Sequence, residues 1–365
     1  MDNQELTTLI YIRDVKNVTI CQAEYEHERR RQDITNKLLQ MAEKDDQVFV
    51  ETTSCKNAQS VLEEHNIVLI VGSSGEGKDF IARRLIRHAI NDRYLYQPVS
   101  KLADWERVNS AENFVVLIEN AFQKTACCPK HCTDWGKWIY TIDEHIRSSN
   151  EVEGSIKIVI TMKPEILGKM QKEFRESALF VLNPIVDLTK NALSFNEKYH
   201  MFKRHAVHYK VSRFDECIKT ICEYDTPCFP SCVRMFFSNK TVMERGVPFF
   251  ANPIPFFHSE ITYIYEKDKP LYTLLVLLLL HDGIITNDIE KLVSSTNKDI
   301  PTILIGFSNV NDIKRELKEV LSRNQPLYIR NEDGVIKCRF PSITEAVCIH
   351  FGENMTQESI KCLPF

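Results

Sequence analysis

A glycine-rich loop between two apolar runs most strongly constrains the fold of this chain. Residues 72–79 read Gly-Ser-Ser-Gly-Glu-Gly-Lys-Asp and meet every fixed position of the pattern G-x-x-x-x-G-K-[S/T] except the last. This pattern is typical of a phosphate-binding loop, in which backbone N–H groups and the lysine surround phosphate oxygens. The last position holds Asp79, whereas a Ser or Thr hydroxyl usually binds the Mg²⁺ of the nucleotide there.

The residues on either side predict a strand before the loop and a helix after it. Ile67–Val71 is a continuous apolar run, as expected of a strand buried on both faces. After the loop, Ile81, Leu85 and Ala89 recur at helical spacing. A loop in this position directs the helix N-terminus towards an anion, which a plain glycine turn would not do. The predicted nucleotide-binding residues are Gly72, Ser73, Ser74, Gly75, Glu76, Gly77, Lys78, Asp79 and Phe80.

Composition fits a folded soluble protein and excludes several classes. The 365 residues are 43% hydrophobic and 26% charged, which is ordinary for a chain of roughly two or three compact units. A net charge of −4 provides no general basic field for nucleic acid. The longest apolar run, Leu271–Leu280, is shorter than the ~20 residues that span a bilayer. The start is acidic and polar, unlike a signal peptide, so we expect a cytoplasmic protein that does not bind membranes.

The chain has 12 cysteines, which we expect to be reduced because no export signal is visible. A cluster in residues 127–132 offers Cys127, Cys128, His131 and Cys132 as potential zinc ligands. It lacks paired C-x-x-C spacing, which favours a simple loop cluster over a zinc site. We expect four further cysteines to pack at helix and turn positions, namely Cys217, Cys222, Cys228 and Cys232.

The first half of the chain predicts a charged leader and an α/β core. Residues 1–46 form the leader, helical over 22–45 with Ala23, Ile34, Leu38 and Met41 as a thin apolar stripe, and Val18–Ile20 as a short strand. The leader is either a solvated helix or a partner-binding segment. Residues 47–185 alternate strand and helix patterns, which predicts a parallel sheet with helices on both faces. The expected strands are 67–71, 94–99, 114–118, 156–161 and 178–182.

The second half turns helical. Residues 186–270 are expected to form a helical lid, in which Ser194 and Glu197 make a capping box that opens a helix to about Tyr209. Residues 271–352 read as an apolar helix, two amphipathic helices and two β-prone runs around Asp333-Gly334, a strong hairpin signal. This order predicts a winged helix, and residues 353–365 are expected to form a tail.

Polar residues also end two later strands. Phe114–Ile118 is followed by Glu119 and Asn120, where nucleoside triphosphatases place acids that hold Mg²⁺ and polarise water. We predict both as catalytic residues, with Glu119 and Asp79 as metal ligands. The strand at 156–161 ends in Thr161, which is also predicted as catalytic together with Lys163, Thr161 by sensing the γ-phosphate and Lys163 by offsetting its charge. Ordinary polar strand ends are an equally open interpretation.

The order of these motifs resembles the novel STAND NTPases of the third type, signal-transduction ATPases with numerous domains. The resemblance covers roughly residues 47–350 and includes an entry segment at 49–52 with the pattern Phe-Val-x-Thr. The other matching positions, in order, are Ala58, Leu62, the loop, Trp135, Thr161, 188–194, 229–230 and 246–253. The resemblance implies a P-loop ATPase core, a helical lid and a winged helix around the nucleotide, and it adds Pro230 to the nucleotide contacts. Exchange or hydrolysis would switch a closed monomer to an oligomer.

Several positions depart from that family's pattern. They are Asp79 for Ser or Thr, Glu119-Asn120 for two acids, Lys163 for an Arg, Cys55 for an aromatic residue and Pro341 for a His. A carboxylate beside a triphosphate costs ~1–4 kcal/mol unless metal lies between them. Asp can bind Mg²⁺, so a metal requirement stays open. Together these departures favour weak or absent hydrolysis.

We therefore expect a nucleotide-binding signalling switch that binds ATP or ADP, with a non-catalytic pseudo-ATPase scaffold as the alternative. A winged-helix nucleic-acid binder is disfavoured because the expected recognition helix, residues 312–323, mixes cations with anions. Expected partners are the nucleotide, proteins that bind the leader or the winged helix, and further copies of the chain. We expect no repeat region after the winged helix, so either the leader is the effector, or the protein acts through partners, or the chain is a truncated form.

Overall fold

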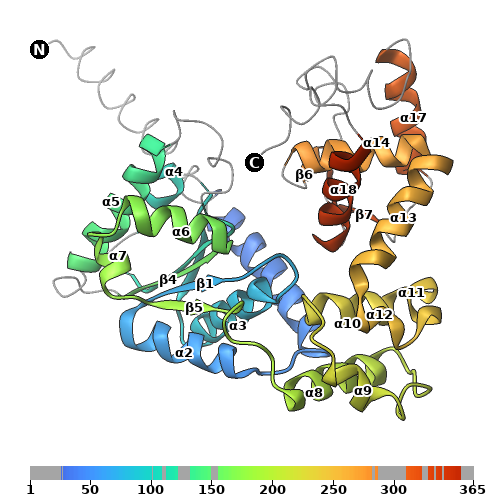
Figure 1. Cartoon of the computed structure of the whole chain (residues 1–365). Helices are drawn as coiled ribbons and strands as arrows, with labels where there is room; N and C mark the ends of the chain where they lie inside the picture. The colour runs from blue at the N-terminus through green and yellow to red at the C-terminus, as the bar shows by residue number, and fades with distance from the viewer. Residues whose placement is uncertain are drawn as a thin grey trace, which may run out of the picture.

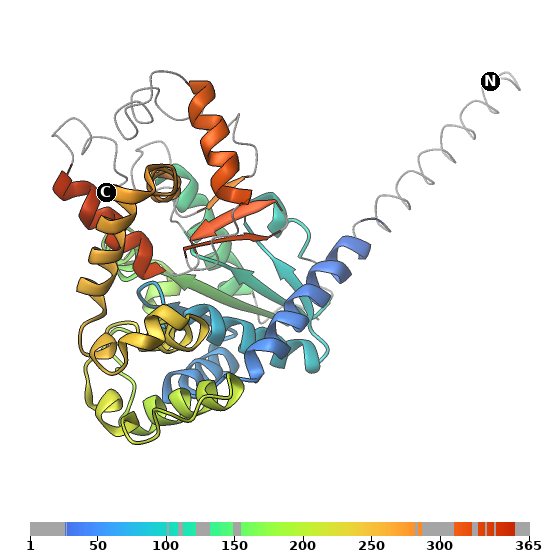
Figure 2. The ribbon, with the colours of Figure 1, turned by 90° about the vertical axis from the view of Figure 1, so that its right-hand side faces the viewer.

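The computed structural model shows an α/β core beside a helical region that ends in a small sheet (Figures 1 and 2). It describes residues 26, 28–100, 102–108, 112–121, 132–148, 155–281, 284–286, 310–322, 328–332, 334–338 and 341–354. In this described part of the chain, every helix is too short or too polar to cross a lipid bilayer.

The core is a five-stranded parallel sheet with the order β2-β3-β4-β1-β5. The strands are β1 (Ile67–Val71), β2 (Leu95–Pro98), β3 (Phe114–Ile118), β4 (Ile156–Met162) and β5 (Ile185–Asp187). Every residue of β1 and β3 is buried, because helices cover both faces of the sheet. The predicted α/β class and the first four predicted strands are confirmed.

Side chains of β1 alternate between two apolar clusters, one on each face of the sheet. Val68 and Ile70 pack with α2 (Thr53–His65) and α3 (Lys78–Asn91). Ile67, Leu69 and Val71 pack with α5 (Cys132–Ser148), α6 (Pro164–Glu173) and α7 (Ala178–Val181). A short helix, α4 (Leu102–Trp105), follows β2. Figure 1 shows these two helix layers on opposite sides of the sheet.

The fifth predicted strand was wrong. Residues 178–182 form α7 and its C-cap, and the fifth strand is β5, a few residues later. Ser177 caps α7 by accepting a hydrogen bond from the Leu179 N–H, at 3.2 Å, and Asp143 of α5 accepts from the same N–H. The apolar run is too short for periodicity to distinguish a strand from a helix, and the side-chain caps decide the outcome.

The described part of the leader is a helix over residues 28–46. Its predicted apolar stripe is only partly correct. Leu38 is buried against the core, and so is Ala42, whereas Ile34 and Met41 are 42% and 49% exposed. The helix therefore docks with a narrower face than the sequence suggests. Ala23 and the strand predicted at 18–20 lie outside the described residues.

A helical region follows the core. Its helices are α8 (Phe195–His208), α9 (Ile218–Glu223), α10 (Phe229–Ser238), α11 (Lys240–Arg245), α12 (Pro248–Ala251) and α13 (Pro253–Lys267). The predicted capping box is confirmed, since Ser194 and Glu197 make both reciprocal hydrogen bonds at the start of α8. The rings of Phe202, Phe236 and Phe250 form the centre of its core.

The C-terminal part combines helices with a three-stranded antiparallel sheet of order β6-β8-β7. Its elements are α14 (Lys269–Leu280), β6 (Ile284–Thr286), α17 (Val310–Ser322), β7 (Ile329–Glu332), β8 (Val335–Cys338) and α18 (Pro341–Asn354). The predicted hairpin is present, with Gly334 at φ +78° between β7 and β8. Asp333 lies outside the described residues, and so does the first of the two predicted amphipathic helices.

The predicted packing cysteines are free thiols within helices and turns of the helical region. Cys222 and Cys232 are buried, and Cys217 and Cys228 are partly buried. Of the cluster in residues 127–132, only the backbone of Cys132 is described, where α5 begins. The zinc question therefore falls outside the described residues.

Candidate functional site

The glycine loop leaves the carboxyl end of β1, a buried strand between β4 and β5. Ligands of open parallel sheets bind in the crevice beyond this end of the strands. Helix α3 begins at Lys78, immediately after the loop, and Gly77 is its N-cap without a side-chain cap. The first N–H groups of α3 therefore remain available to an external acceptor.

Two glycines give the loop its shape. Gly75 has φ +91° and Gly77 has φ +97°, a region that residues with a Cβ rarely adopt. Lys78 follows directly and is only 5% exposed. Among the described residues, no carboxylate lies within ion-pair distance of Lys78. A buried ammonium group needs an anion nearby, so the loop has the character of an anion-binding site.

Glu76 braces the loop from within. The Ser73 N–H donates to Glu76 Oε2 at 2.7 Å. A Cβ on Gly72 would lie 2.8 Å from that oxygen, so a side chain at the first glycine would displace the Glu76 carboxylate that braces the loop. Burial raises the pKa of the Glu76 carboxyl, and the Ser73 N–H and Lys78 partly offset this rise.

Helix α10 packs directly onto the loop. The Ser231 N–H donates to the Gly75 carbonyl at 3.2 Å, and Cys228 Sγ donates to the Ser74 carbonyl at 3.0 Å. Pro230 Cγ would lie 3.9 Å from a Cβ on Gly77. Pro230, predicted from the resemblance, therefore lies beside the loop. Sequence reasoning assigned Cys228 to packing rather than to the site and did not single out Ser231, and the only signal for either was closeness to Pro230 in the sequence.

The two predicted metal ligands come together. Asp79 Oδ1 is buried and has no hydrogen-bond partner. Glu119 directly follows β3 and is exposed to solvent, yet desolvation by the surrounding protein and then the Asp79 carboxylate raise its pKa. Among the described residues, no set of three or more His, Cys, Asp or Glu side chains could hold a metal ion. A cation here would therefore take its other ligands from water and phosphate.

The other predicted catalytic residues lie where β3 and β4 end. The Asn120 N–H donates to Thr161 Oγ1 at 2.9 Å, and the Ala121 N–H donates to the Thr161 carbonyl at 2.9 Å. Thr161 is fully buried, so its hydroxyl ties the two strand ends together. Lys163 is exposed and precedes α6. The structure thus places Asn120 and Thr161 in contact, whereas Lys163 lies exposed just beyond the end of β4.

Charged residues that the sequence did not single out also surround the site. Arg83 of α3 and Lys337 of β8 both act to lower the pKa of Glu119. Glu345 of α18 has its pKa raised by burial, and Lys163 opposes that rise. Lys337 and Glu345 are more than 200 residues away from the loop in the sequence, so no local motif could reveal them.

A separate apolar groove lies between α4 and α5. Its lining residues are Leu102, Trp105, Glu106, Gly136, Lys137, Tyr140 and Thr141. None of these residues belongs to the loop or to the other predicted site positions. The groove therefore offers an alternative place for a small molecule, and an experiment on the loop has to distinguish the two.

Three solved structures illustrate the comparison, and each is a distant match. A Walker-type ATPase of Pyrococcus abyssi is 12% identical, with 82% of this chain and 96% of that chain covered and a TM-score of 0.40. The ORC2 protein of Aeropyrum pernix, in ADPNP–ADP complexes, is 13% identical, with 82% and 92% covered and a TM-score of 0.36. AMPPCP-bound DnaA from Aquifex aeolicus is 12% identical, with 73% and 87% covered and a TM-score of 0.36. Scores this low support no conclusion about function.

Comparison by sequence is more informative for the core. No curated protein matches the chain. Residues 49–208, however, match the model of the family described as Novel STAND NTPase 3, and this segment contains the entry segment, the glycine loop, the whole parallel sheet and α8. The resemblance drawn from the ordered motifs is therefore confirmed over residues 49–208, where this chain matches the Novel STAND NTPase 3 family model.

Proposed function

We propose that this chain is a nucleotide-binding switch that binds ATP or ADP at residues 72–79, with weak or absent hydrolysis. One observation carries the proposal. The Lys78 ammonium is buried at the N-terminus of α3, and among the described residues no carboxylate lies within ion-pair distance. A phosphate group would supply the missing anion and accept hydrogen bonds from the first N–H groups of α3.

The same site suits Mg²⁺. Magnesium binds to one or two carboxylates and completes its coordination with water and phosphate oxygens. Asp79 and Glu119 are two neighbouring carboxylates, and the unpartnered Asp79 Oδ1 is the kind of atom that a cation would satisfy. The metal, when bound, would neutralise charge between these carboxylates and the nucleotide.

The local chemistry disfavours rapid hydrolysis. Asn120 stands where a second acid would activate water, and an amide cannot take a proton from water. Asp79 replaces a neutral hydroxyl and repels a triphosphate whenever no metal lies between them. We propose that Thr161 and Lys163 respond to the γ-phosphate rather than promote its transfer.

We further propose the domain division that the family resemblance implies. The units are a leader at 1–46, a core at 47–185, a helical lid at 186–270, a winged helix at 271–352 and a tail at 353–365. The contact of α10 with the loop supports a lid role, and the β7–β8 hairpin supports a winged helix. The γ-phosphate would bias how these units pack and whether the chain oligomerises.

A non-catalytic scaffold is the second candidate, since Asp79 and Asn120 replace residues used in catalysis. Nucleic-acid binding is disfavoured because α17 carries both cations and anions along its length. Protein partners would bind the leader or the winged helix. The first two candidates differ in whether Asp79 and Glu119 support the binding of Mg²⁺–ATP.

Titration calorimetry of ATP and ADP, with Mg²⁺ and with EDTA, tests the proposal. The unmodified chain should bind nucleotide, and Lys78→Ala should weaken binding at least about tenfold, since a lost charge-assisted contact of 1.5–3 kcal/mol corresponds to that change. Lys172→Ala, an exposed lysine of α6, is the matched control and should bind normally. A folded chain that binds no nucleotide under any of these conditions would leave the scaffold as the better account.

A further inference from the structure

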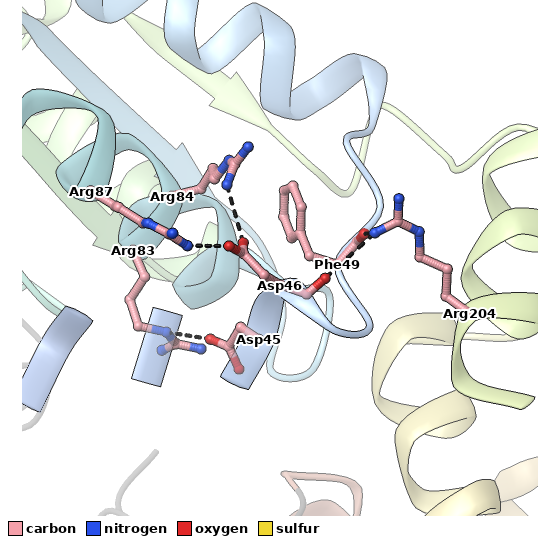
Figure 3. A network of polar contacts seen from close by, with 7 residues as sticks. All are labelled: Asp45, Asp46, Phe49, Arg83, Arg84, Arg87 and Arg204. Carbon is pink, nitrogen blue, oxygen red and sulfur yellow. Dashed lines mark hydrogen bonds and ion pairs between the residues drawn. The ribbon is translucent and has the colours of Figure 1, made fainter. Parts of the chain in front are cut away.

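An ion-pair network connects the end of the leader helix to α3 (Figure 3). Arg83 Nε donates to Asp45 Oδ2 at 2.8 Å. Arg84 Nη1 donates to Asp46 Oδ1 at 3.1 Å, and Arg87 donates to the other oxygen of the Asp46 carboxylate. Two consecutive carboxylates of the leader are thus held by three arginines on the helix that follows the glycine loop.

The same short segment is held from its other side by α8. Arg204 of α8 donates to the Phe49 carbonyl at 2.6 Å and to the Asp46 carbonyl at 3.5 Å. The Arg84 guanidinium lies over the Phe49 ring, 5.4 Å from its centroid. Figure 3 shows residues 45–49 between the arginines of α3 and Arg204. This segment therefore bridges the core and the helical region.

Electrostatics make the two sides of the bridge depend on each other. Two aspartates in the last turn have the wrong sign for the dipole of the leader helix. Three arginines close together on α3 repel one another. Each group is therefore unfavourable alone and favourable with the other, and the pairs are partly buried, with Arg83 at 14% and Asp45 at 20% side-chain exposure. Separating them would leave partly desolvated charges without partners.

The bridge is also linked to two sides of the proposed nucleotide site, directly through α3 and indirectly through α8. Arg83 follows Asp79 by one turn of α3 and acts to lower the pKa of Glu119. Helix α8 packs on α10 through the rings of Phe202 and Phe237, whose centroids are 4.8 Å apart. Helix α10 in turn contacts the loop. A change in how α10 fits the loop would therefore act on Arg204 through α8.

We propose that this network is a latch that couples nucleotide occupancy to docking of the leader helix. The latch consists of Asp45, Asp46, Phe49, Arg83, Arg84, Arg87 and Arg204. The inference rests on the proposed function, because nucleotide bound between the loop and α10 would hold both sides of the latch together. Loss of nucleotide would loosen the latch and free the helix over residues 28–46. Coupling is reciprocal, so a broken latch would also weaken nucleotide binding.

Two variants break the latch in different places. Asp46→Asn removes the carboxylate shared by Arg84 and Arg87, and Arg204→Met removes the contacts from α8 while leaving the ion pairs intact. Asp215→Asn is the matched control, because it breaks the exposed pair of Asp215 with Lys203, the residue next to Arg204. Circular dichroism establishes that each variant is folded.

Limited trypsin digestion reports release of the leader, because Arg30 and Lys44 are exposed cleavage sites in its helix. Calorimetry reports ATP affinity on the same samples. In the unmodified chain and in the control, Mg²⁺–ATP should slow this cleavage about fivefold or more, the lower end of ordinary coupling. Both latch variants should lose this protection and should bind ATP about fivefold or more weakly.

The outcomes separate the latch from the proposed function. If ATP binds normally to both variants and cleavage of the leader does not depend on nucleotide, the latch is overturned and the nucleotide site stands. If the folded, unmodified chain does not bind ATP, the nucleotide site fails and the latch fails with it. If Asp215→Asn also loses the ATP-dependent protection of the leader from trypsin, the effect comes from any disturbance of α8, and the latch is overturned.

Discussion

At the residue scale, the chemistry of the site depends on Asp79. Its backbone position at the start of α3 is that of the usual hydroxyl residue, but its buried Oδ1 has no hydrogen-bond partner. A carboxylate so placed requires a cation, and it raises the pKa of Glu119 in addition to the effect of desolvation. Nucleotide binding at this site should therefore be more dependent on Mg²⁺ than in a loop that ends in Ser or Thr.

Asp79→Thr should raise ATP hydrolysis about fivefold or more, since relief of ~1–4 kcal/mol of repulsion corresponds to at least that change in rate. Phosphate release under saturating Mg²⁺–ATP measures the effect. Asp79→Asn is the control, because it removes the charge without supplying a hydroxyl. Rapid turnover in the unmodified chain would show that the altered positions do not limit catalysis.

Gly75→Ala should lower the free energy of unfolding by about 1–3 kcal/mol, because alanine is strained at positive φ. The new Cβ would also lie 2.8 Å from Ser231 Cβ, so α10 has to move off the loop and ATP binding should weaken. Urea unfolding and calorimetry measure the two effects. Gly168→Ala on α6 is the control, since a Cβ added at Gly168 would have no atom within 4 Å. Equal effects at both glycines would contradict the close packing of α10.

At the element scale, α8 has a buried histidine that should make the protein sensitive to acid. His205 is 5% exposed, stacks on Tyr209 and Phe237, and has an Nδ1 atom without a hydrogen-bond partner. Burial, and then the nearby Arg234 and His208, lower its pKa from 6.5 to about 3. Between these two values the unfolded chain binds the extra proton, so stability falls as pH falls through this window.

His205→Phe should abolish this loss. Relative to pH 7, the unmodified chain should lose ~2 kcal/mol at pH 5 through His205 alone, about 1.36 kcal/mol for each pH unit below 6.5. Urea unfolding of both proteins at pH 7 and pH 5 measures how much stability each loses. Subtracting the loss of His205→Phe from that of the unmodified chain cancels the contribution of the other titrating groups. A difference between the proteins that does not change with pH would contradict the buried, neutral state of His205.

Local signals predicted many elements well. The IVLIV run gave β1, and the reciprocal hydrogen bonds of Ser194 and Glu197 start α8 as expected. The run at 178–182 was misassigned because its conformation depends on Asp143 and Ser177, which cap α7 from outside the run. Pattern alone cannot supply such partners.

The candidate site also divides into residues that local sequence patterns reveal and residues that they do not. The loop and Glu119 could be found because each is a short string after an apolar strand. Lys337 and Glu345 could not be found, because only the fold of the whole chain brings β8 and α18 near the loop. The contact of α10 with Gly75 was visible only through the resemblance at Pro230.

At the scale of the whole molecule, the loop lies at the boundary between two apolar cores. The sheet and its helices pack around β1, whereas α8 to α18 share a separate core. Helix α10 contacts the loop across this boundary, and residues 45–49 bridge it (Figure 3). Nucleotide at the loop would therefore act where the two units meet, which is the arrangement that a switch requires.

Hydrogen exchange measured by mass spectrometry, with and without Mg²⁺–ATP, tests this account most directly because it locates the bound nucleotide. We predict slower exchange in peptides that cover the loop at 72–80 and the start of α10 at 229–231. Lys78→Ala should abolish this protection. ATP-dependent protection confined to the groove between α4 and α5, or protection of the loop that persists in Lys78→Ala, would contradict a nucleotide site at the glycine loop.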